Sequence, residues 1–483
     1  MTFWRRLALA VLFPLLLHFT GTWALPLLDR DEPRFAEATR EMRAGGDWLV
    51  PHFNQHYRFD KPPLTYWAQA LSIQVFGESE AAVRLPSVVA SALTSLVLFL
   101  WGRRVASEIT GLNAALIFAT ALQVLIHSKQ AVADSLLVLS ITLGAWAGWE
   151  MMNQKRGTGG GRSLLFPGLF VAALALGFLA KGPLGWLPFG MIALFRFRRG
   201  PVNPAWPLAG WLFLLALALV ALWGLPALLS THGEYWREGI GRHVIARGFT
   251  TFEGHGGGGI GIYLALLPFY CVTVFASFFP WSIWLPGLIR QSWSRKETDA
   301  LTGYLLGGVI LVFGIFTFYK TRLPHYTLPA FPFLALLLAR EWSRLGRSAH
   351  LLRRGVLGMT ALLGLVIVLV FPVLRRTNPA RQLLGQVAGA LKPEMEFASV
   401  EYEEPSLVWY FRSRVNGYFS SLPAEEIPGY MAKPGPRFCV LPVAVANHLF
   451  PTLPPGLQQA GEFSGFNVVH GRRVDLRLII KPD

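Results

Sequence analysis

Runs of apolar residues, each long enough to cross a lipid bilayer, recur along most of this chain of 483 residues. Inside a bilayer every backbone N–H and C=O group needs a partner within the protein, so such runs fold as α-helices. We therefore predict an α-helical polytopic membrane protein with about eleven transmembrane helices, or up to about thirteen if the tightest connections are counted differently. The predicted runs are 7–27, 82–101, 109–127, 132–151, 164–180, 183–196, 206–229, 262–289, 301–319, 324–339 and 355–374.

Two of these runs carry additional signals. The run 262–289 is long for one helix and contains Pro268 and Pro280, which interrupt helical hydrogen bonding, so we expect it to begin as a segment on the membrane surface. The stretch from Leu7 to Leu28 is followed by charged residues without a small-residue cleavage site. We interpret it as a retained first helix rather than a cleaved signal peptide.

The charge balance favours a membrane protein over a nucleic-acid-binding one. The chain is 53% hydrophobic and only 15% charged, whereas soluble domains carry roughly 25% charged residues. Many of the Lys and Arg residues behind the net charge of +16 lie in short connections between apolar runs, where they set membrane orientation. We therefore expect no nucleic-acid partner. The only two cysteines, Cys271 and Cys439, give no indication of a disulfide.

Six groups of basic residues fall on alternate connections, and the positive-inside rule places all six in the cytoplasm. The first polar stretch, the 230–261 loop, the Lys320–Pro324 turn and all residues after Arg375 then lie outside. The six groups are Arg5/Arg6, Arg103/Arg104, Lys155/Arg156/Arg162, Arg196/Arg198/Arg199, Arg290/Arg295/Lys296 and Arg344/Arg347/Arg353/Arg354.

The sequence predicts two domains. Residues 1–375 form the transmembrane domain, with a first outer loop at 28–67 and a long outer loop at 230–261. Residues 376–483 are less apolar, and we expect a small α/β domain there on the outer side. Its predicted elements are strands near 437–441 and 474–480 and helices near 379–391 and 404–412.

The first outer loop places many ionisable groups beside aromatic ones. Within it, Pro33 to Met42 and Leu64 to about Phe76 are expected to form short helices on the membrane surface. Ionisable groups beside a bilayer are costly, so the loop is a candidate functional site. The alternative is a solvated loop whose charges only repel lipid. The ionisable residues are Asp29, Asp31, Glu32, Arg34, Asp60 and Lys61.

This combination of carboxylates and cations suits a phosphorylated amphiphile. Arg and Lys hold phosphate oxygens, and a carboxylate acts on a nucleophile or stabilises developing positive charge. The sequence Asp29-Arg30-Asp31 is also a candidate for a divalent metal such as Mg²⁺, which is often held by carboxylates together with substrate phosphates. Whether a metal is required stays open.

Other polar residues lie at the outer ends of predicted helices. Asp134 and Lys181 are examples, and the alternative for Lys181 is a side chain that reaches to lipid headgroups. His243 could equally be an ordinary loop histidine. The glycine run 254–259 lacks the Gly-Lys-Ser/Thr sequence of a nucleotide-binding loop, and we interpret it as a mobile lid over the site.

Several motifs of this chain resemble those of the lipid A aminoarabinose transferases. With the protein O-mannosyltransferases, these enzymes belong to the C-type membrane glycosyltransferases, which use polyprenyl-phosphate sugars. The resemblance covers most of residues 1–345 in the same order. The matching motifs are Asp31-Glu32-Pro33-Arg34-Phe35-Ala36-Glu37, Gly46-Asp47-Trp48-Leu49-Val50-Pro51, Phe59-Asp60-Lys61-Pro62-Pro63-Leu64, Ala82-Val83-Arg84-Leu85-Pro86, Ala180-Lys181-Gly182-Pro183, Phe279-Pro280-Trp281-Ser282 and Arg322-Leu323-Pro324-His325-Tyr326.

The resemblance implies a role for each matching residue. Asp31 matches the family's first-loop aspartate beside the reacting anomeric carbon, and Asp134 matches a second acidic position near the same cavity. The resemblance therefore implies that both are catalytic. Lys61, Arg247 and Tyr326 match positions that hold the phosphate of the carrier lipid. The other residues assigned to the substrate cavity are Glu32, Arg34, Asp60, Lys181, His243, Arg322 and His325.

Some residues depart from the family pattern. Phe35 stands where many relatives carry Tyr, and Arg242 precedes His243 where Glu is common. The chain is also shorter than typical aminoarabinose transferases. These differences leave the identity of the sugar open.

The resemblance implies a bacterial inner-membrane enzyme with a cytoplasmic N-terminus and a periplasmic C-terminal domain. It would move a sugar from an undecaprenyl-phosphate donor to lipid A or another envelope glycan, with inversion in a single displacement. A protein O-glycosyltransferase is the alternative within this class. A lipid or sugar transporter or flippase is the alternative outside it, but transporters place charges near the midplane, whereas the charges here gather at one face. A binding or sensor protein without catalysis is a further alternative.

Overall fold

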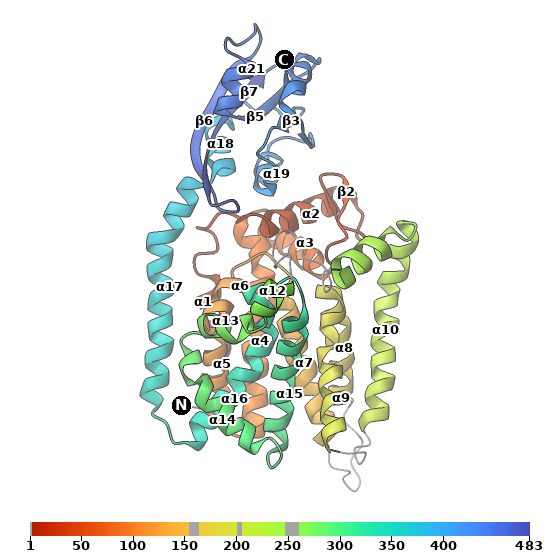
Figure 1. Ribbon diagram of the computed structural model, residues 1–483, viewed down its shortest axis with the longest axis vertical. Coiled ribbons are helices and arrows are strands. Elements are labelled where there is room, and N and C mark those ends of the chain that lie inside the picture. The colour runs from red at the N-terminus through yellow and green to blue at the C-terminus, as the bar shows by residue number, and fades with distance from the viewer. Residues whose placement is uncertain (1, 154–163, 200–204, 247–259) are drawn as a thin grey trace. The chain divides into compact units, whose positions relative to one another are not determined.

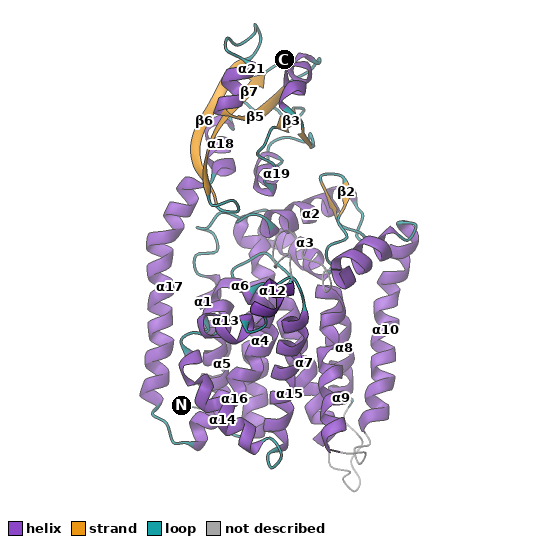
Figure 2. Cartoon of the chain, viewed as in Figure 1, coloured by secondary structure: helices purple, strands orange, loops and turns teal. Residues whose placement is uncertain are grey.

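The computed structural model describes residues 2–153, 164–199, 205–246 and 260–483 (Figure 1). Within this part of the chain most residues are helical, and the strands form a short hairpin and one larger sheet (Figure 2). The chain divides into two compact units. The first unit comprises Met1–Thr20, Phe59–Ala68 and Arg84–Leu363, and the second comprises Gly21–Arg58, Gln69–Val83 and Gly364–Asp483.

The first unit is a bundle of apolar helices around a core that includes Trp101, Ile141 and Phe333. Three helices, α3 (Leu64–Phe76), α4 (Glu80–Val105) and α17 (Ala349–Thr377), contribute residues to both units. The other elements of the first unit are α1 (Phe3–Phe19), α5 (Glu108–Ala119), α6 (Leu122–His127), α7 (Asp134–Asn153), α8 (Leu165–Lys181), η1 (Gly182–Trp186), α9 (Leu187–Arg199), α10 (Ala205–Ser230), the π-helix η2 (Tyr235–Ala246), α12 (Ile260–Ala265), α13 (Phe269–Ser277), η3 (Trp281–Trp284), α14 (Leu285–Arg295), α15 (Ala300–Phe318), η4 (Pro324–Ala330) and α16 (Phe331–Arg344).

Six helical stretches among the described residues are long and apolar enough to cross a membrane. Several other predicted runs form helices shorter than a bilayer needs, among them α5 and α16. The count of about eleven crossings therefore stays a prediction. The six stretches are Glu80–Val105, Asp134–Asn153, Leu165–Arg196, Trp206–Ser230, Ala300–Phe318 and Ala349–Thr377.

The first helix ends earlier than the predicted run 7–27, at Phe19. The chain leaves the helical path at Gly21, whose φ of +85° lies in the left-handed region that favours glycine. Lys129 stabilises this end, because its Nζ donates to the carbonyl oxygens of Leu17, His18 and Thr20 at 2.7, 2.8 and 2.7 Å. The terminal carbonyls of a helix lack partners within the helix, so a cation there satisfies them.

The predicted run 262–289 is divided by its two prolines. Pro268 lies just before α13, and Pro280 lies just before η3, so the run becomes α12, α13, η3 and the start of α14. Proline has no backbone N–H, and this loss ends the hydrogen bonding of the preceding helix. Ser282 donates its hydroxyl to the Phe275 carbonyl oxygen at 2.6 Å and so bonds one of the carbonyls near the break.

A tight turn at Gly182 positions the end of α8. Gly182 has a φ of +69°, and the chain turns there into η1. Gly177 and Gly185 pack backbone against backbone, since a Cβ on Gly185 would lie 2.1 Å from the Gly177 carbonyl carbon. The close approach therefore requires glycine, and it fixes Lys181 at the turn.

The second unit contains a five-stranded mixed sheet in the order β4-β3-β5-β7-β6. Strands β4, β3 and β5 run parallel, and β5, β7 and β6 run antiparallel. Phe397 stacks on Phe438 with ring centroids 5.2 Å apart, and Phe411 packs against Phe438. The elements are α18 (Pro379–Val387), β3 (Glu396–Ser399), α19 (Pro405–Phe411), β4 (Phe419–Ser421), η5 (Ala424–Glu426), α20 (Ile427–Ala432), β5 (Arg437–Pro442), α21 (Val443–Leu449), β6 (Gln458–Asn467) and β7 (Arg472–Lys481).

The second unit also includes residues Gly21–Arg58, which cover most of the first outer loop. The two-domain prediction, with its single boundary at residue 375, assigns this loop to the transmembrane domain. The two expected helices are present as α2 (Asp31–Gly45) and α3, and β1 (His52–Phe53) pairs with β2 (His56–Tyr57). Helix α2 packs on α19 through buried charges. Arg412 Nη1 donates to Glu37 Oε1 at 2.5 Å and to Glu41 Oε1 at 2.9 Å, and the Arg40 guanidinium lies 3.9 Å from the Trp409 ring.

A second contact between these segments involves Asp29. Its Oδ1 accepts from the Ser406 backbone N–H at 2.8 Å, and its Oδ2 accepts from the Ser406 hydroxyl at 2.6 Å. Burial raises the pKa of Asp29 to about 7, and the nearby Glu404 carboxylate adds to the rise. The folded protein therefore favours the protonated carboxyl of Asp29 more strongly than the unfolded chain does.

The raised pKa of Asp29 predicts a pH-dependent stability. The stabilising contribution is complete below the usual aspartate pKa and is lost as the pH rises through about 7. We expect the free energy of unfolding of the wild type to fall by about 2 kcal/mol more between pH 5 and pH 8 than that of Asp29→Asn. Thermal unfolding of the purified chain in detergent measures this difference. Asp475→Asn, at an exposed position of the same unit, should keep the wild-type slope, and equal slopes in all three proteins would exclude Asp29 as the source.

Candidate active site

A cavity of about 580 Å³ lies within the first unit. Most of its wall is apolar and comes from α8, α9, α10 and α15, including Phe178, Leu187, Val220 and Ile315. Ligand sites of this volume are commonly apolar with a few polar groups that fix orientation. The polar and titratable side chains on the wall are Asp60, Lys61, Asp134, Lys181, Tyr235, Tyr319, His325 and Tyr326.

Lys61 enters the cavity from the loop before α3. Its Nζ donates to Asp60 Oδ1 at 2.7 Å and to the Asp60 carbonyl oxygen at 3.0 Å. Phe59, the residue before Asp60, packs edge-on against Tyr235 of η2 with ring centroids 5.3 Å apart. The aromatic contact anchors this loop at the cavity, and both Asp60 and Lys61 lie partly buried on its wall.

Asp134 and Lys181 form a second ion pair on the same wall. Lys181 Nζ donates to Asp134 Oδ1 at 2.6 Å, and both side chains are about 13–14% exposed. Asp134 is the first residue of α7 and Lys181 the last of α8, so two helix ends bring the charges together. An acid at a helix amino end and a base at a carboxyl end both suit the helix dipole. Lys181 therefore neutralises a buried acid rather than reaching toward lipid headgroups.

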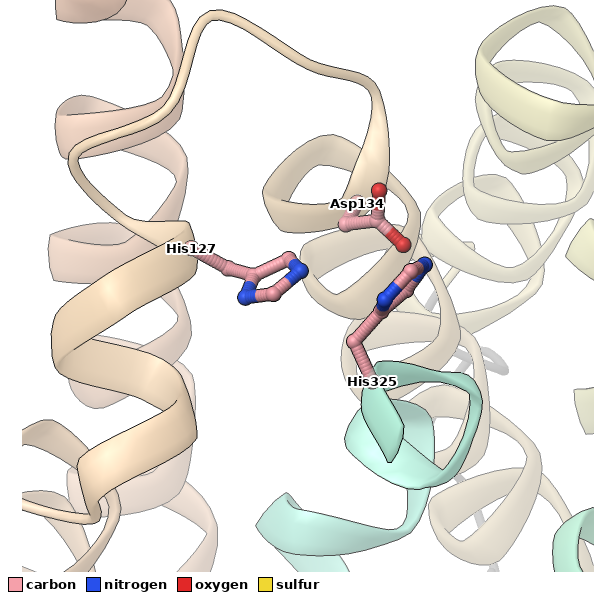
Figure 3. A group of neighbouring side chains, drawn as sticks. All are labelled: His127, Asp134 and His325. Carbon is pink, nitrogen blue, oxygen red and sulfur yellow. The ribbon is translucent and has the colours of Figure 1, made fainter. Parts of the chain in front are cut away.

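His325 and Tyr326 reach the cavity from η4. Lys181 Nζ lies 5.8 Å from the centroid of the Tyr326 ring, and the His325 and Tyr326 rings are 5.0 Å apart. Figure 3 shows His325 beside Asp134, with His127 across from both. The centroids of the His127 and His325 rings are 4.8 Å apart. Six of the predicted site residues thus line one cavity: Asp60, Lys61, Asp134, Lys181, His325 and Tyr326.

Arg322 takes a different place from the one predicted. Among the described residues, those that line the cavity do not include Arg322. Its guanidinium donates to the carbonyl oxygens of Tyr263 and Thr317 at 3.2 and 3.1 Å and lies 4.9 Å from the Tyr263 ring. These contacts hold the segment between α15 and η4, which directly precedes His325 and Tyr326. Arg322 therefore fixes the backbone next to His325 and Tyr326 through these hydrogen bonds.

The remaining predicted residues belong to the second unit or fall outside the described residues. Asp31, Glu32 and Arg34 are in α2 of the second unit, where Glu32 accepts from the Leu28 backbone N–H at 3.0 Å. Their convergence with Lys61 and Tyr326 stays a prediction. His243 falls in η2, but its side chain, like Arg247 and the glycine run 254–259, lies outside the described residues.

The predicted metal site at Asp29-Arg30-Asp31 gains no support from the surroundings of Asp29. Both carboxylate oxygens of Asp29 accept hydrogen bonds from Ser406. A metal at Asp29 would have to compete with these bonds.

The sequence reasoning missed His127 and most of the aromatic wall. His127 is the last residue of α6, seven positions before Asp134, and an imidazole at the end of an apolar run was the available signal. Trp186 and Tyr235 line the cavity from η1 and η2, where Trp186 stacks on Phe178. Aromatic residues are frequent throughout this chain, so nothing in the sequence distinguished these two.

Comparison with known proteins supports the resemblance. A family model described as dolichyl-phosphate-mannose-protein mannosyltransferase matches residues 60–223. An undecaprenyl phosphate-alpha-4-amino-4-deoxy-L-arabinose arabinosyl transferase of Sodalis glossinidius is 32% identical over 369 residues, which are 75% of this chain and 62% of the relative. The corresponding protein of Pseudomonas aeruginosa is 33% identical over 382 residues, with 75% and 65% of the two chains covered. This chain thus spans somewhat less than two thirds of these relatives.

Solved structures show the same fold over nearly the whole chain. ArnT from Cupriavidus metallidurans bound to undecaprenyl phosphate superimposes with a TM-score of 0.76 at 19% identity, and 98% of this chain and 97% of that chain are covered. The oligosaccharyltransferase AglB from Archaeoglobus fulgidus, in complex with an inhibitory peptide and a dolichol-phosphate, gives a TM-score of 0.54 at 13% identity, covering 92% and 70%. The chain belongs to the superfamily of C-type membrane glycosyltransferases that includes the aminoarabinose transferases and the protein mannosyltransferases.

Proposed function

We propose that this chain transfers a glycosyl group from an undecaprenyl-phosphate-sugar donor to lipid A or another acceptor of the bacterial envelope. The reaction takes place at the periplasmic face of the inner membrane, with the N-terminus in the cytoplasm, and inverts the anomeric centre in a single displacement. The observation that carries the proposal is the cavity, in which apolar walls and two lysines occur together.

The cavity fits the two parts of such a donor. Apolar walls from α8 to α10 and α15 suit an isoprenoid chain, which gains free energy when its surface leaves water. The ammonium groups of Lys61 and Lys181 suit a phosphate, because each carries three donors and a positive charge. In the relatives, the names refer to an undecaprenyl phosphate substrate, and the ArnT structure is bound to undecaprenyl phosphate.

The lysines act on the leaving group. When the glycosidic bond to the phosphate breaks, negative charge builds up on the phosphate oxygens, so a cation there stabilises the transition state more than the ground state. Lys61 is already bonded to Asp60 at 2.7 Å, and a phosphate would share its ammonium with that carboxylate. Asp60 thereby holds Lys61 in the cavity before the donor arrives.

The role of Asp31 depends on whether the acceptor group is a phosphate or a hydroxyl. A lipid phosphate acceptor is anionic already and needs orientation more than deprotonation. A hydroxyl acceptor needs a base, and Asp31 at the amino end of α2 is the proposed one. Asp134 stays paired with Lys181 and keeps that lysine in position.

Lys61→Ala should weaken donor binding. The substitution removes a cation from the phosphate, and charged hydrogen bonds contribute about 1.5–3 kcal/mol, which corresponds to about 10- to 100-fold in dissociation constant. Titration of the purified chain with undecaprenyl phosphate, followed by intrinsic tryptophan fluorescence, measures the loss. Lys433→Ala, at an exposed position of the second unit, should bind as the wild type does. Wild-type affinity in Lys61→Ala would place the phosphate site elsewhere.

Asp31→Asn should abolish transfer while donor binding is retained. An amide cannot accept a proton or offset positive charge at the anomeric carbon, and loss of a positioned carboxylate costs about 100- to 10,000-fold in rate. Turnover with a radiolabelled donor and binding of undecaprenyl phosphate should be measured on the same preparation. Asp475→Asn serves as the matched control at an exposed aspartate. Normal turnover of Asp31→Asn would remove this residue from the mechanism.

The function itself is tested in cells. Mass spectrometry of lipid A, other envelope glycans and envelope proteins should be compared between cells with and without the chain. We expect a glycosyl mass difference on lipid A or another envelope glycan that disappears when Asp31→Asn replaces the wild type. A difference confined to proteins would instead identify a protein O-glycosyltransferase, and no glycosyl difference in any fraction would contradict glycosyl transfer.

A further inference from the structure

Two histidines and an aspartate from three separate segments converge at the edge of the cavity. His127 ends α6, Asp134 begins α7 and His325 lies in η4, and Figure 3 shows their side chains gathered between these elements. One ligand atom from each residue lies within 4.8 Å of the other two. His127 and Asp134 are buried, and His325 is half-buried. None of the steps proposed above uses the two histidines.

The residue types and spacing fit a transition-metal ion. Two imidazoles and one carboxylate, with a further position left open, are a recurrent ligand set for Zn²⁺ and related divalent ions, with metal–ligand distances of about 2.0–2.2 Å. Ligands around such an ion lie about 3.4 Å apart, so the three groups would need to close by roughly 1 Å.

A neighbouring amide orients one of the imidazoles. Gln123 Nε2 lies 2.9 Å from His127 Nδ1, one helical turn earlier in α6. The oxygen and nitrogen of an amide are interchangeable by a rotation of 180°, so Gln123 can also accept a proton from Nδ1. In this arrangement the amide would fix the orientation of the His127 ring. Ligating histidines typically bond their second nitrogen to the protein in this way.

Lys181 occupies part of the same site. Its Nζ donates to Asp134 Oδ1 at 2.6 Å, so the lysine supplies the positive charge that a buried carboxylate requires. A divalent ion on Asp134 would repel the ammonium of Lys181. Metal binding and the Lys181–Asp134 ion pair are therefore expected to compete. Because Lys181 and His325 both line the cavity, metal binding would release the ammonium toward the cavity interior.

We propose that His127, Asp134 and His325 form a binding site for a divalent transition-metal ion of the Zn²⁺ class, with Lys181 as a built-in competitor. The proposal goes beyond glycosyl transfer and does not depend on it. The competing interpretation is that the two imidazoles pack beside an ion pair and bind no metal.

Metal titration of the purified full chain tests the proposal. After treatment with a chelator, the wild type should bind one Zn²⁺ per chain in calorimetry and give visible d–d absorption with Co²⁺. His127→Gln and His325→Gln should each weaken Zn²⁺ binding by about 100-fold or more. His350→Gln, at an exposed histidine in the first turn of α17, should bind Zn²⁺ as the wild type does. Circular dichroism and size-exclusion chromatography establish that each variant is folded.

Lys181→Met separates a metal site from simple packing. Removal of the competing charge should tighten Zn²⁺ binding by about tenfold, and Zn²⁺ should raise the melting temperature of this variant more than that of the wild type. A packing role for the histidines predicts neither effect. The proposal is overturned if the wild type binds no stoichiometric Zn²⁺, if both histidine variants bind it unchanged, or if Lys181→Met binds it more weakly.

Discussion

The ion pair between Lys181 and Asp134 joins the ends of two helices within the first unit. A carboxylate among apolar helices is tolerated only when a cation lies within bonding distance, and here the two charges come from the facing ends of α7 and α8. The chain turns at Gly182, directly after Lys181, and Gly177 and Gly185 pack backbone against backbone next to this turn. The charged contact and a backbone approach that no larger residue would permit thus lie at the same end of α8.

The same reasoning extends to the chemistry of the cavity. Each lysine on its wall is held by an acid, Lys61 by Asp60 and Lys181 by Asp134. Without a ligand the four charges balance, so the cavity can carry two cations in an apolar setting. Positioned charges of this kind need little rearrangement when charge develops on a bound phosphate.

Much of this arrangement could be predicted from the sequence, because some signals are local. Such signals determine the secondary structure of the residues next to them. They include the acids and glycines around α2, the β-branched residues of β7 and the two prolines of the 262–289 run. His127 could not be identified because its significance arises only beside His325, 198 positions later in the numbering. The role of Arg322 could not be read from the motif it shares with His325 and Tyr326, since the motif does not show that its side chain bonds the carbonyl oxygens of Tyr263 and Thr317.

The composition of the second unit has a consequence for how the protein is made. Asp29 and Ser406 are bonded across 377 positions, and Asn54 bonds the backbone of Phe419 across 365. While the ribosome is still translating the helical bundle, the residues from 21 to 58 have no partner from α19 or the sheet. Contacts of such long sequence separation form late in folding. Helix α2 therefore acquires its final packing only after nearly the entire polypeptide has been synthesised, which makes the intact C-terminal region a requirement for the correct folding of the beginning of the chain.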